Sequence, residues 1–151
     1  MSGTVEYELF EESMLDACTD LFLEVFTREP WNDEWESKDH ARQYILNHCR
    51  MNTFYGFVAL LDKKVVGVSI GFLKPWQEGY EYYINEFYVD TSLQNRGIGS
   101  GLLRFIKEYL AEKSTATAIM LATEKNFPAF RFYIKNGFKA LDDLRFLAMD
   151  V

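Results

Sequence analysis

The spacing of apolar residues along this chain changes from a helical period to a strand pattern and back again. Between Leu15 and Phe26, and again within residues 38–50, apolar side chains recur every three or four positions, as they do on one face of a helix. Residues 54–61 and 65–73 are instead rich in β-branched and aromatic residues, and the turn sequence between them predicts a β-hairpin. Residues 99–113 return to the helical period.

Extended to the whole chain, residues 1–151, this pattern predicts a single α/β or α+β domain in which helices flank a mixed sheet. We expect strands at residues 4–9, 54–61, 65–73, 80–89 and 117–123, one or two more within 138–150, and helices at 15–26, 38–50, 99–113 and 126–135. The predicted sheet therefore has six to seven strands, flanked by about four helices. The strand at 117–123 is short and apolar, so we expect it to be buried, and the segment 74–79 is expected to be a loop.

Charge and composition narrow the class of function. The chain has 151 residues, a net charge of −7 and a pI near 4.9, which argues against binding nucleic acid through phosphate contacts and, more mildly, against binding an anionic membrane surface. Aromatic residues make up 17% of the chain, enough to fill a core and also to line a pocket.

Cysteine and histidine are too few and too scattered to suggest metal binding. The chain has two of each, so we predict no metal site and two reduced thiols in a cytoplasmic protein. The N-terminus is acidic and unlike a signal peptide, and no apolar run approaches the length of a membrane span.

Three glycines fall within five positions, between a predicted strand and a predicted helix. A strand that passes through a glycine turn into a helix presents several unpaired N–H groups at one point, which makes an anion site. The dinucleotide fingerprint G-x-G-x-x-G fails because Leu102 takes its third glycine position, and no G-K-[ST] of a P-loop follows. A pyrophosphate is the ligand that we predict here, because a tight turn alone would explain one glycine more easily than three.

Two motifs resemble those of a known family. Residues 94–99, QNRGIG, fit the Q/R-x-x-G-x-G/A motif of the GNAT superfamily, the Gcn5-related acetyl-CoA-dependent N-acetyltransferases. Residues 126–138, NFPAFRFYIKNGF, fit the same family's N-x-x-A-x-x-F-Y-x-x-x-G-F pattern. The resemblance covers residues 54–140, whereas the first fifty residues agree only in the order of elements. It implies a GNAT-like domain with a mostly antiparallel central sheet.

The resemblance implies acetyl-CoA as the cofactor. The glycine turn would wrap the pyrophosphate of coenzyme A, strand 80–89 would pair along its edge with the pantetheine arm, and the second motif would contact that arm. The residues implied to bind coenzyme A are Phe87, Tyr88, Val89, Gln94, Asn95, Arg96, Gly97, Ile98, Gly99, Ser100, Asn126, Phe132 and Tyr133. Asn126 could instead cap its helix, and Arg96 could instead be a solvated surface residue.

Transfer of an acyl group from a thioester to an amine requires the amine to lose a proton. Glu86 is the predicted general base because it lies on the strand that should border the thioester, and the resemblance implies a carboxylate there in several acetyltransferases of polyamines and aminoglycosides. Strand alternation is not phased by the sequence, so Glu86 could also face away in a structural role. The resemblance implies that Tyr133 donates a proton or a hydrogen bond to the leaving thiolate, and we expect direct attack without an acyl-enzyme.

The acceptor that we expect is a small cationic amine, such as a polyamine or an aminoglycoside. Acidic residues in segments 29–36 and 78–86 alternate with aromatic ones, and this combination suits ammonium groups. The predicted substrate-binding residues are Trp31, Glu34, Glu81 and Tyr83. Two alternatives stay open: acetylation of a protein N-terminus or lysine, and a non-catalytic domain that senses acyl-CoA. A homodimer also stays open, because members of this family often dimerise.

Overall fold

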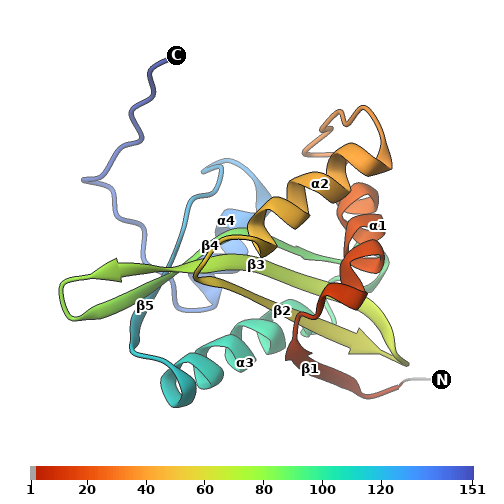
Figure 1. Ribbon diagram of the computed structural model, residues 1–151, viewed down its shortest axis with the longest axis horizontal. Helices are drawn as coiled ribbons and strands as arrows, with labels where there is room; N and C mark the ends of the chain where they lie inside the picture. Colours follow the sequence, from red (N-terminus) through yellow and green to blue (C-terminus); the bar gives the residue numbers. More distant parts are fainter. Residues whose placement is uncertain (1–2) are drawn as a thin grey trace.

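The computed structural model describes residues 3–151, and its elements follow the predicted order as far as the fourth helix (Figure 1). The strands are β1 (Val5–Leu9), β2 (Phe54–Leu61), β3 (Lys64–Trp76), β4 (Gly79–Val89) and β5 (Ala116–Leu121). The helices are α1 (Leu15–Phe26), α2 (Lys38–Cys49), α3 (Ile98–Lys113) and α4 (Pro128–Lys135), with short 3₁₀ turns η1 (Glu12–Met14) and η2 (Thr91–Leu93). Within residues 3–151, no helix combines the length and the apolar character that a membrane crossing requires.

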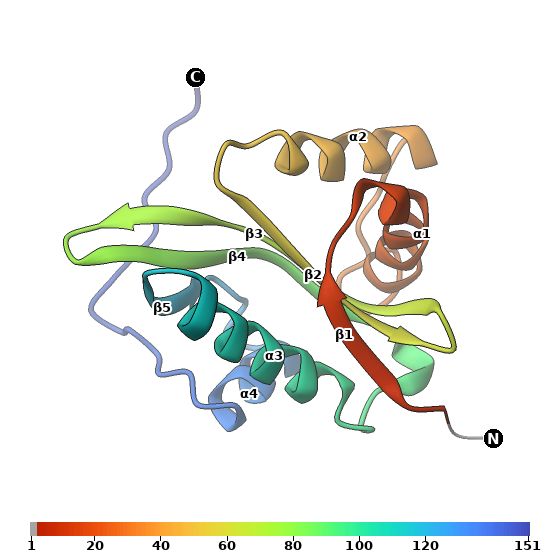
Figure 2. The ribbon, with the colours of Figure 1, turned by 60° about the horizontal axis from the view of Figure 1, so that its bottom comes forward.

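The strands form one sheet in the order β1-β2-β3-β4-β5. β1 to β4 pair antiparallel, and β5 lies parallel to β4 after the connection through α3. The mixed, mostly antiparallel sheet is therefore confirmed. α1 and α2 pack on one face of it and α3 and α4 on the other, each pair over its own apolar core (Figure 2).

The strands expected at the C-terminal end are not formed. Residues 138–150 hold no strand, so the sheet built by the described residues has five strands rather than six or seven. Residues 139–151 are exposed throughout, and no other strand pairs with them. An apolar pattern is not sufficient for a strand, because its hydrogen bonds must come from a neighbour.

Two smaller predictions about the sheet were also wrong. Segment 74–79 is not a loop, because β3 and β4 stay paired as far as Trp76 and Gly79 and form one long hairpin. β5 is not a buried strand either, since each of its residues is exposed or half-buried.

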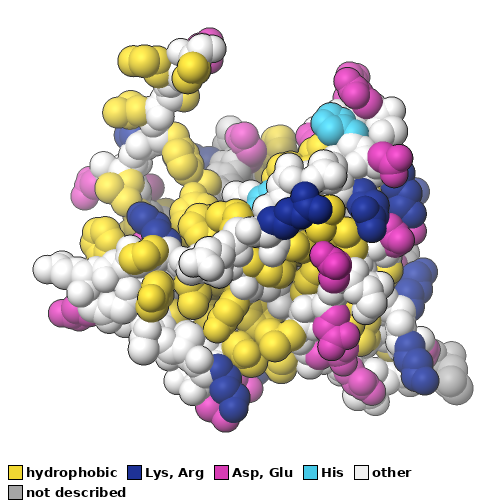
Figure 3. Space-filling model, viewed as in Figure 1, with side chains coloured by type: hydrophobic (Ala, Val, Ile, Leu, Met, Phe, Trp, Pro, Cys, Tyr) yellow, Lys and Arg dark blue, Asp and Glu magenta, His cyan; other side chains and the backbone are white. Residues whose placement is uncertain are grey.

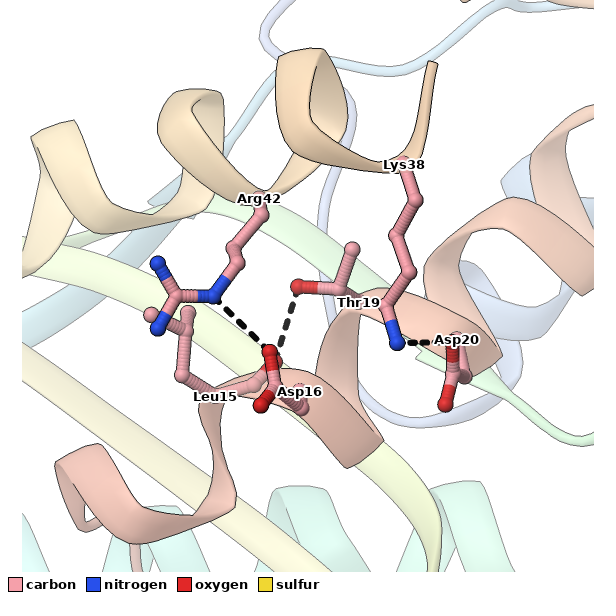
Figure 4. A network of polar contacts seen from close by, with 6 residues as sticks. All are labelled: Leu15, Asp16, Thr19, Asp20, Lys38 and Arg42. Atoms are coloured by element: carbon pink, nitrogen blue, oxygen red, sulfur yellow. Dashed lines mark hydrogen bonds and ion pairs between the residues drawn. The ribbon is translucent and has the colours of Figure 1, made fainter.

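Ion pairs on the exposed side of the two covering helices join α1 to α2 (Figure 4). Arg42 Nε donates to Asp16 Oδ1 at 2.8 Å, and Lys38 Nζ lies 2.9 Å from Asp20 Oδ1. Exposed ion pairs contribute little stability individually, so the apolar core beneath is what mainly holds the two helices in place. The position of α2 matters for function because it carries side chains that reach β4.

Candidate active site

β4 and β5 separate along their length, and the gap opens into a groove. β4 pairs with β5 only from Tyr80 to Ile84, whereas it stays paired with β3 as far as Val89. The groove has a volume of about 560 Å³ and is lined by the end of α1 and the loop after it, the last residues of β4, the turn that begins α3, and α4. Because the sheet is open here, residues from both of its faces line the same space.

The free edge of β4 offers hydrogen-bonding groups to this groove. The Asp90 N–H donates to the Val66 carbonyl on β3 at 2.8 Å. Backbone groups of a strand point alternately to its two sides, so the N–H and C=O groups of Phe87 and Val89 point to the edge that β5 leaves open. A ligand that contains amides can pair with this edge as a further strand would.

The turn that begins α3 leaves backbone donors free. Gly97 is the N-cap residue, no side chain caps the helix, and the first helical bond runs from the Gly101 N–H to the Gly97 carbonyl at 2.9 Å. The N–H groups of Ile98, Gly99 and Ser100 therefore have no acceptor within the helix. All three residues line the groove, so this end of it suits an anion, which the helix dipole also favours.

The three glycines of the turn are needed for different reasons. Gly97 has a φ of 77°, a left-handed backbone that most residues adopt only with strain. A Cβ on Gly99 would come within 2.9 Å of the Phe132 ring, and a Cβ on Gly101 would overlap the Tyr7 hydroxyl. Gly97 and Gly99 thus shape the groove, whereas Gly101 allows α3 to pack against β1.

A β-bulge at Asn85 decides which way Glu86 points. The β3–β4 register shifts between Ile84 and Glu86 and leaves Asn85 without a partner. Ile84 packs in the core under α3, whereas Tyr88 packs in the core under α1 and α2. The extra residue therefore reverses the alternation of the strand, and Glu86 faces α2.

A hydrogen-bond network from α2 holds Glu86. The Tyr44 hydroxyl donates to Glu86 Oε2 at 2.5 Å, and Asn85 Nδ2 lies 3.5 Å from the same hydroxyl and 2.6 Å from His48 Nε2. His48 Nδ1 lies 2.9 Å from the Tyr44 carbonyl, a contact that needs the imidazole proton on Nδ1 and leaves Nε2 to accept from Asn85.

The pKa of Glu86 is raised above its ordinary value. Burial is the largest cause, the hydrogen bond from Tyr44 acts in the opposite direction, and the negative charge of Asp33 raises the pKa further. Glu86 is therefore a stronger base than an exposed glutamate.

Tyr44, His48 and Asn85 were missed by the sequence analysis. Tyr44 occupies one of the apolar positions of its helix, and it meets Glu86 across 42 positions of sequence. The available signal was the four-residue spacing of Tyr44 and His48, which places both on one side of α2. No signal in the sequence marks Asn85 as a bulge.

Tyr133 lies on α4 and lines the groove from the other face of the sheet. Its side chain is 8% exposed, and its ring packs against Phe87, Phe132 and Phe138 with centroids 5.3 to 6.0 Å apart. Burial raises the pKa of Tyr133, and the negative charge of Glu86 raises it further. The hydroxyl consequently stays protonated at neutral pH and can act as a donor.

Most residues predicted to bind coenzyme A line the groove. They are Phe87, Tyr88, Val89, Gln94, Asn95, Gly97, Ile98, Gly99, Ser100, Phe132 and Tyr133. Arg96 and Asn126 are exposed and lie outside its lining. Asn126 does not cap its helix, because Phe127 is the N-cap residue and α4 begins at Pro128.

Of the residues predicted to bind substrate, Trp31 alone lines the groove. Glu34 is exposed on the loop between α1 and α2. Glu81 and Tyr83 share the face of β4 that Glu86 occupies, but they lie nearer the tip of the β3–β4 hairpin, where Glu81 Oε1 is 3.9 Å from Lys74 Nζ.

Two residues of the loop after α1, Asp33 and Trp35, influence or contact the pair formed by Tyr44 and Glu86. Asp33 raises the pKa of both Glu86 and Tyr44 through its negative charge, and burial raises the pKa of Asp33 itself. Trp35 packs on Tyr44 with ring centroids 5.1 Å apart, and its Nε1 is buried without a partner among the described residues. This side of the site therefore combines carboxylates with aromatic rings. Within residues 3–151, no group of three or more His, Cys, Asp or Glu side chains is placed to hold a metal ion.

Fold and motifs together define an acyltransferase. The family model described as "Acetyltransferase (GNAT) family" matches residues 15–138, and the chain therefore belongs to this family of enzymes.

Solved structures with the same fold include several acetyltransferases. An aminoglycoside acetyltransferase from an uncultured soil metagenomic sample, in complex with sisomicin, is 24% identical with a TM-score of 0.75 and covers 97% of this chain and 96% of its own. A possible acetyltransferase from Clostridium difficile 630 is 19% identical with a TM-score of 0.83 and covers 97% of both chains. The aminoglycoside N-acetyltransferase AAC(6')-Iy, in complex with CoA, is 13% identical with a TM-score of 0.78 and covers 100% of this chain and 98% of its own.

Proposed function

We propose that this protein is an acetyl-CoA-dependent N-acetyltransferase that acetylates a primary amine of a small cationic molecule by direct attack. The observation that carries the proposal is the groove at the free end of β4, beyond the part of β4 that pairs with β5. One end of it presents free backbone N–H groups, and its wall includes Phe87, Tyr88 and Val89 of β4. Glu86 precedes these residues on β4 and is held by Tyr44, but it is not itself among the residues that line the groove.

The groove fits coenzyme A in its chemistry. The unpaired N–H groups of Ile98, Gly99 and Ser100 are donors for a diphosphate, and glycine at position 99 leaves room for it. The free edge of β4 at Phe87 and Val89 is a partner for the amides of the pantetheine arm. When bound, acetyl-CoA supplies an activated acetyl group as a thioester.

Glu86 would remove the proton that prevents the amine from attacking. An alkylammonium with a pKa near 10.4 is mostly protonated at pH 7, and freeing the amine costs about 4 to 5 kcal/mol. The raised pKa of Glu86 brings this base closer to neutral pH and makes proton acceptance easier. Tyr44 fixes the direction of the carboxylate through its hydrogen bond.

Tyr133 would stabilise the leaving thiolate from the opposite side of the opening. Its raised pKa makes full proton transfer to a thiolate unfavourable, whereas a protonated hydroxyl is a good hydrogen-bond donor. We therefore assign Tyr133 as a donor to the developing charge on sulfur.

The surroundings of Glu86 support a cationic acceptor. Asp33 and Glu86 supply negative charge, and Trp35 and Tyr44 supply aromatic rings for cation–π contacts. Trp31 adds a further aromatic side chain to the lining of the groove. A structure of similar fold is an aminoglycoside acetyltransferase in complex with sisomicin, which favours an aminoglycoside- or polyamine-like amine.

The test is a turnover screen with acetyl-CoA, in which release of free thiol is measured with polyamines, aminoglycosides, amino acids and short peptides. We expect turnover with one of the first two groups and little with peptides. Turnover with peptides alone would contradict the proposed acceptor. Binding of acetyl-CoA without turnover on any amine would instead identify a sensor domain.

The Glu86→Gln variant tests the chemistry separately. We expect its turnover to fall by about 100-fold or more, most strongly at low pH, with an unchanged dissociation constant for coenzyme A. Undiminished turnover would show that Glu86 is not the base.

A further inference from the structure

His48 and Asn85 belong to the network around Glu86 without touching the groove. His48 lies near the end of α2, and Asn85 is the bulged residue of β4. Neither is among the residues that line the groove. Both histidines of the chain lie on α2, and histidine side chains, cyan in Figure 3, reach the surface over this helix. Any effect of His48 and Asn85 on the reaction must therefore pass through other side chains.

The β-bulge turns two consecutive side chains of β4 toward α2. In a regular strand, the side chains of Asn85 and Glu86 would face opposite ways. Here both reach the Tyr44 hydroxyl, Glu86 Oε2 at 2.5 Å and Asn85 Nδ2 at 3.5 Å. The bulge therefore places a donor and an acceptor on one hydroxyl, because Asn85 donates to it and Glu86 accepts from it.

His48 fixes which way the Asn85 amide points. His48 Nδ1 lies 2.9 Å from the Tyr44 carbonyl, so the neutral ring carries its proton on Nδ1 and keeps a free lone pair on Nε2. Asn85 Nδ2 lies 2.6 Å from that Nε2 and donates to it. The opposite orientation of the amide would set the Asn85 oxygen against the lone pair of Nε2, which is repulsive. The amide NH2 group is therefore held between His48 and Tyr44.

His48 is the stronger of the two contacts that hold Asn85. The Asn85 side chain is exposed, and an exposed asparagine without a firm partner samples several rotamers. Its hydrogen bond to Tyr44 is long, whereas its bond to His48 is short. His48 is itself half-buried and packs edge-on against the Tyr44 ring, with centroids 4.8 Å apart. The histidine is thus a fixed point from which the amide is oriented.

A donor to the Tyr44 oxygen strengthens the hydrogen bond that Tyr44 makes to Glu86. Hydrogen bonds in a chain polarise one another, so a hydroxyl that accepts from an N–H becomes a better donor. Burial is the largest cause that raises the pKa of Tyr44, and the hydrogen bond from Asn85 acts in the opposite direction. The Glu86 carboxylate stands at the end of this chain of donors.

We propose that His48 and Asn85 are positioning residues, which hold the Tyr44 hydroxyl and through it the carboxylate of Glu86. His48 orients the Asn85 amide, the amide supports the Tyr44 hydroxyl, and Tyr44 directs Glu86. The inference rests on the proposed function in one respect, the role of Glu86 as the base. The arrangement itself can be tested without substrate.

The first test is the tautomer of His48, observed by NMR of the ring nitrogens of the wild-type protein in mildly alkaline buffer, where imidazole rings are neutral. The contacts of His48 place its proton on Nδ1. His40 is the internal control, because the Glu36 N–H donates to its Nδ1 at 3.4 Å and leaves the proton on Nε2. We expect opposite tautomers for the two histidines, with signals assigned by His40→Gln. A proton on Nε2 of His48 would overturn the proposal.

The second test is the titration of the Glu86 carboxyl carbon, followed by NMR in the protein without ligands. His48→Phe keeps an aromatic ring beside Tyr44 but removes the acceptor for Asn85, so the Glu86 carboxylate should lose support and titrate at higher pH. Asn85→Ala should move the titration in the same direction. A titration that neither variant changes would overturn the proposal.

A double-variant cycle separates positioning from a merely structural role. Because His48 acts through Tyr44, His48→Phe should shift the titration of Glu86 in the wild type and cause no further shift in the Tyr44→Phe background. Equal shifts in the two backgrounds would overturn the proposal. The other titratable groups that act on or respond to Glu86 are unchanged in these variants; they are Asp33 on the loop after α1, Tyr88 on β4 and Tyr133 on α4.

Turnover with acetyl-CoA measures the functional consequence. We expect His48→Phe to lower kcat by about fivefold, the effect of losing one neutral hydrogen bond, with an unchanged dissociation constant for coenzyme A. Asn47→Ala is the matched control, because it removes an exposed hydrogen bond from Gln43 on the same helix, and its kcat should stay at the wild-type value. An equal loss in both variants would contradict the proposal. Absence of turnover in the wild type would contradict the proposed function alone, since the two NMR tests do not depend on it.

Discussion

The ionisation of Glu86 depends on effects that act on its pKa in opposite directions. Burial disfavours the carboxylate and raises its pKa, and the Tyr44 hydrogen bond stabilises the carboxylate and lowers it. The net effect is a carboxylate that holds a proton more readily than a glutamate in water. This is the property that a general base for an ammonium substrate requires.

Replacing Tyr44 with Phe should move the acid limb of the pH profile. The change removes a hydrogen bond that stabilises the charged form, so the pKa of Glu86 should rise and activity should require a higher pH. The measurement is kcat/KM against pH. Tyr109→Phe, on the opposite face of the sheet, is the matched control and should leave the profile unchanged. An acid limb at the wild-type position would show that Tyr44 does not act on Glu86.

Glu86→Gln should also change how stability depends on pH. A carboxylate whose pKa is raised in the folded state stabilises the fold below its unfolded pKa, and this stabilisation is lost as the pH rises through the folded value. The wild type should therefore lose melting temperature relative to the Gln variant as the pH rises from about 4 to 7. Parallel plots of melting temperature against pH for the two proteins would mean that ionisation of Glu86 does not destabilise the fold.

At the residue scale, the sequence could predict that a carboxylate acts as the base, but not which face of β4 its side chain occupies. Glu86 follows from the motif and the chemistry, whereas the face that it occupies depends on the bulge at Asn85. The partners of Glu86 come from α2 and from the loop that holds Asp33, so they are set by tertiary packing rather than by local pattern.

At the scale of elements, the site is the product of one strand separating from its neighbour and one helix beginning without a side-chain cap. Few residues are required for either feature: the strands separate because β5 is short, and the uncapped start of α3 is formed by a glycine turn. Local patterns predicted the β2–β3 hairpin and α3. They did not predict the length of the β3–β4 hairpin, or that residues 138–150 form no strand. Both depend on whether a neighbouring strand is available to accept and donate the backbone hydrogen bonds.

Substitutions in the glycine turn should separate binding from stability. Gly99→Ala puts a methyl group against the Phe132 ring at the groove, and we expect coenzyme A affinity to fall by about tenfold or more. Gly101→Ala instead collides with Tyr7, and we expect it to lower the free energy of unfolding by about 1 to 3 kcal/mol with little change in affinity.

Calorimetric titration with coenzyme A and denaturant unfolding measure these two quantities on the same samples. Ser100→Ala keeps the backbone donor and is the control for affinity. Loss of affinity in Gly101→Ala, with Gly99→Ala unaffected, would contradict the separate roles assigned to the two glycines.

At the scale of the whole molecule, the net negative charge would favour binding of the proposed amine and disfavour binding of the proposed anionic cofactor. The net charge of −7 would attract the proposed cationic amine and repel the proposed anionic cofactor. Under the proposed function, the free N–H groups at the start of α3 would offset this repulsion of the cofactor, and the same net charge would favour binding of the amine.

Salt should accordingly weaken the reaction with highly charged amines. Between about 0.05 and 0.5 M salt, kcat/KM for a polyamine should fall severalfold, because screening removes its long-range attraction to the protein. A monoamine of similar length is the control and should lose less. Equal losses for the two amines would show that the acidic surface does not select the acceptor.

The central claim is that the main-chain N–H groups at the start of α3 hold the diphosphate of an acyl carrier. A crystal structure of the protein soaked with acetyl-CoA tests it most directly. We predict the diphosphate within hydrogen-bond distance of the Ile98, Gly99 and Ser100 amides, with the pantetheine arm along the free edge of β4. A carrier bound elsewhere, with this turn empty, would contradict the account.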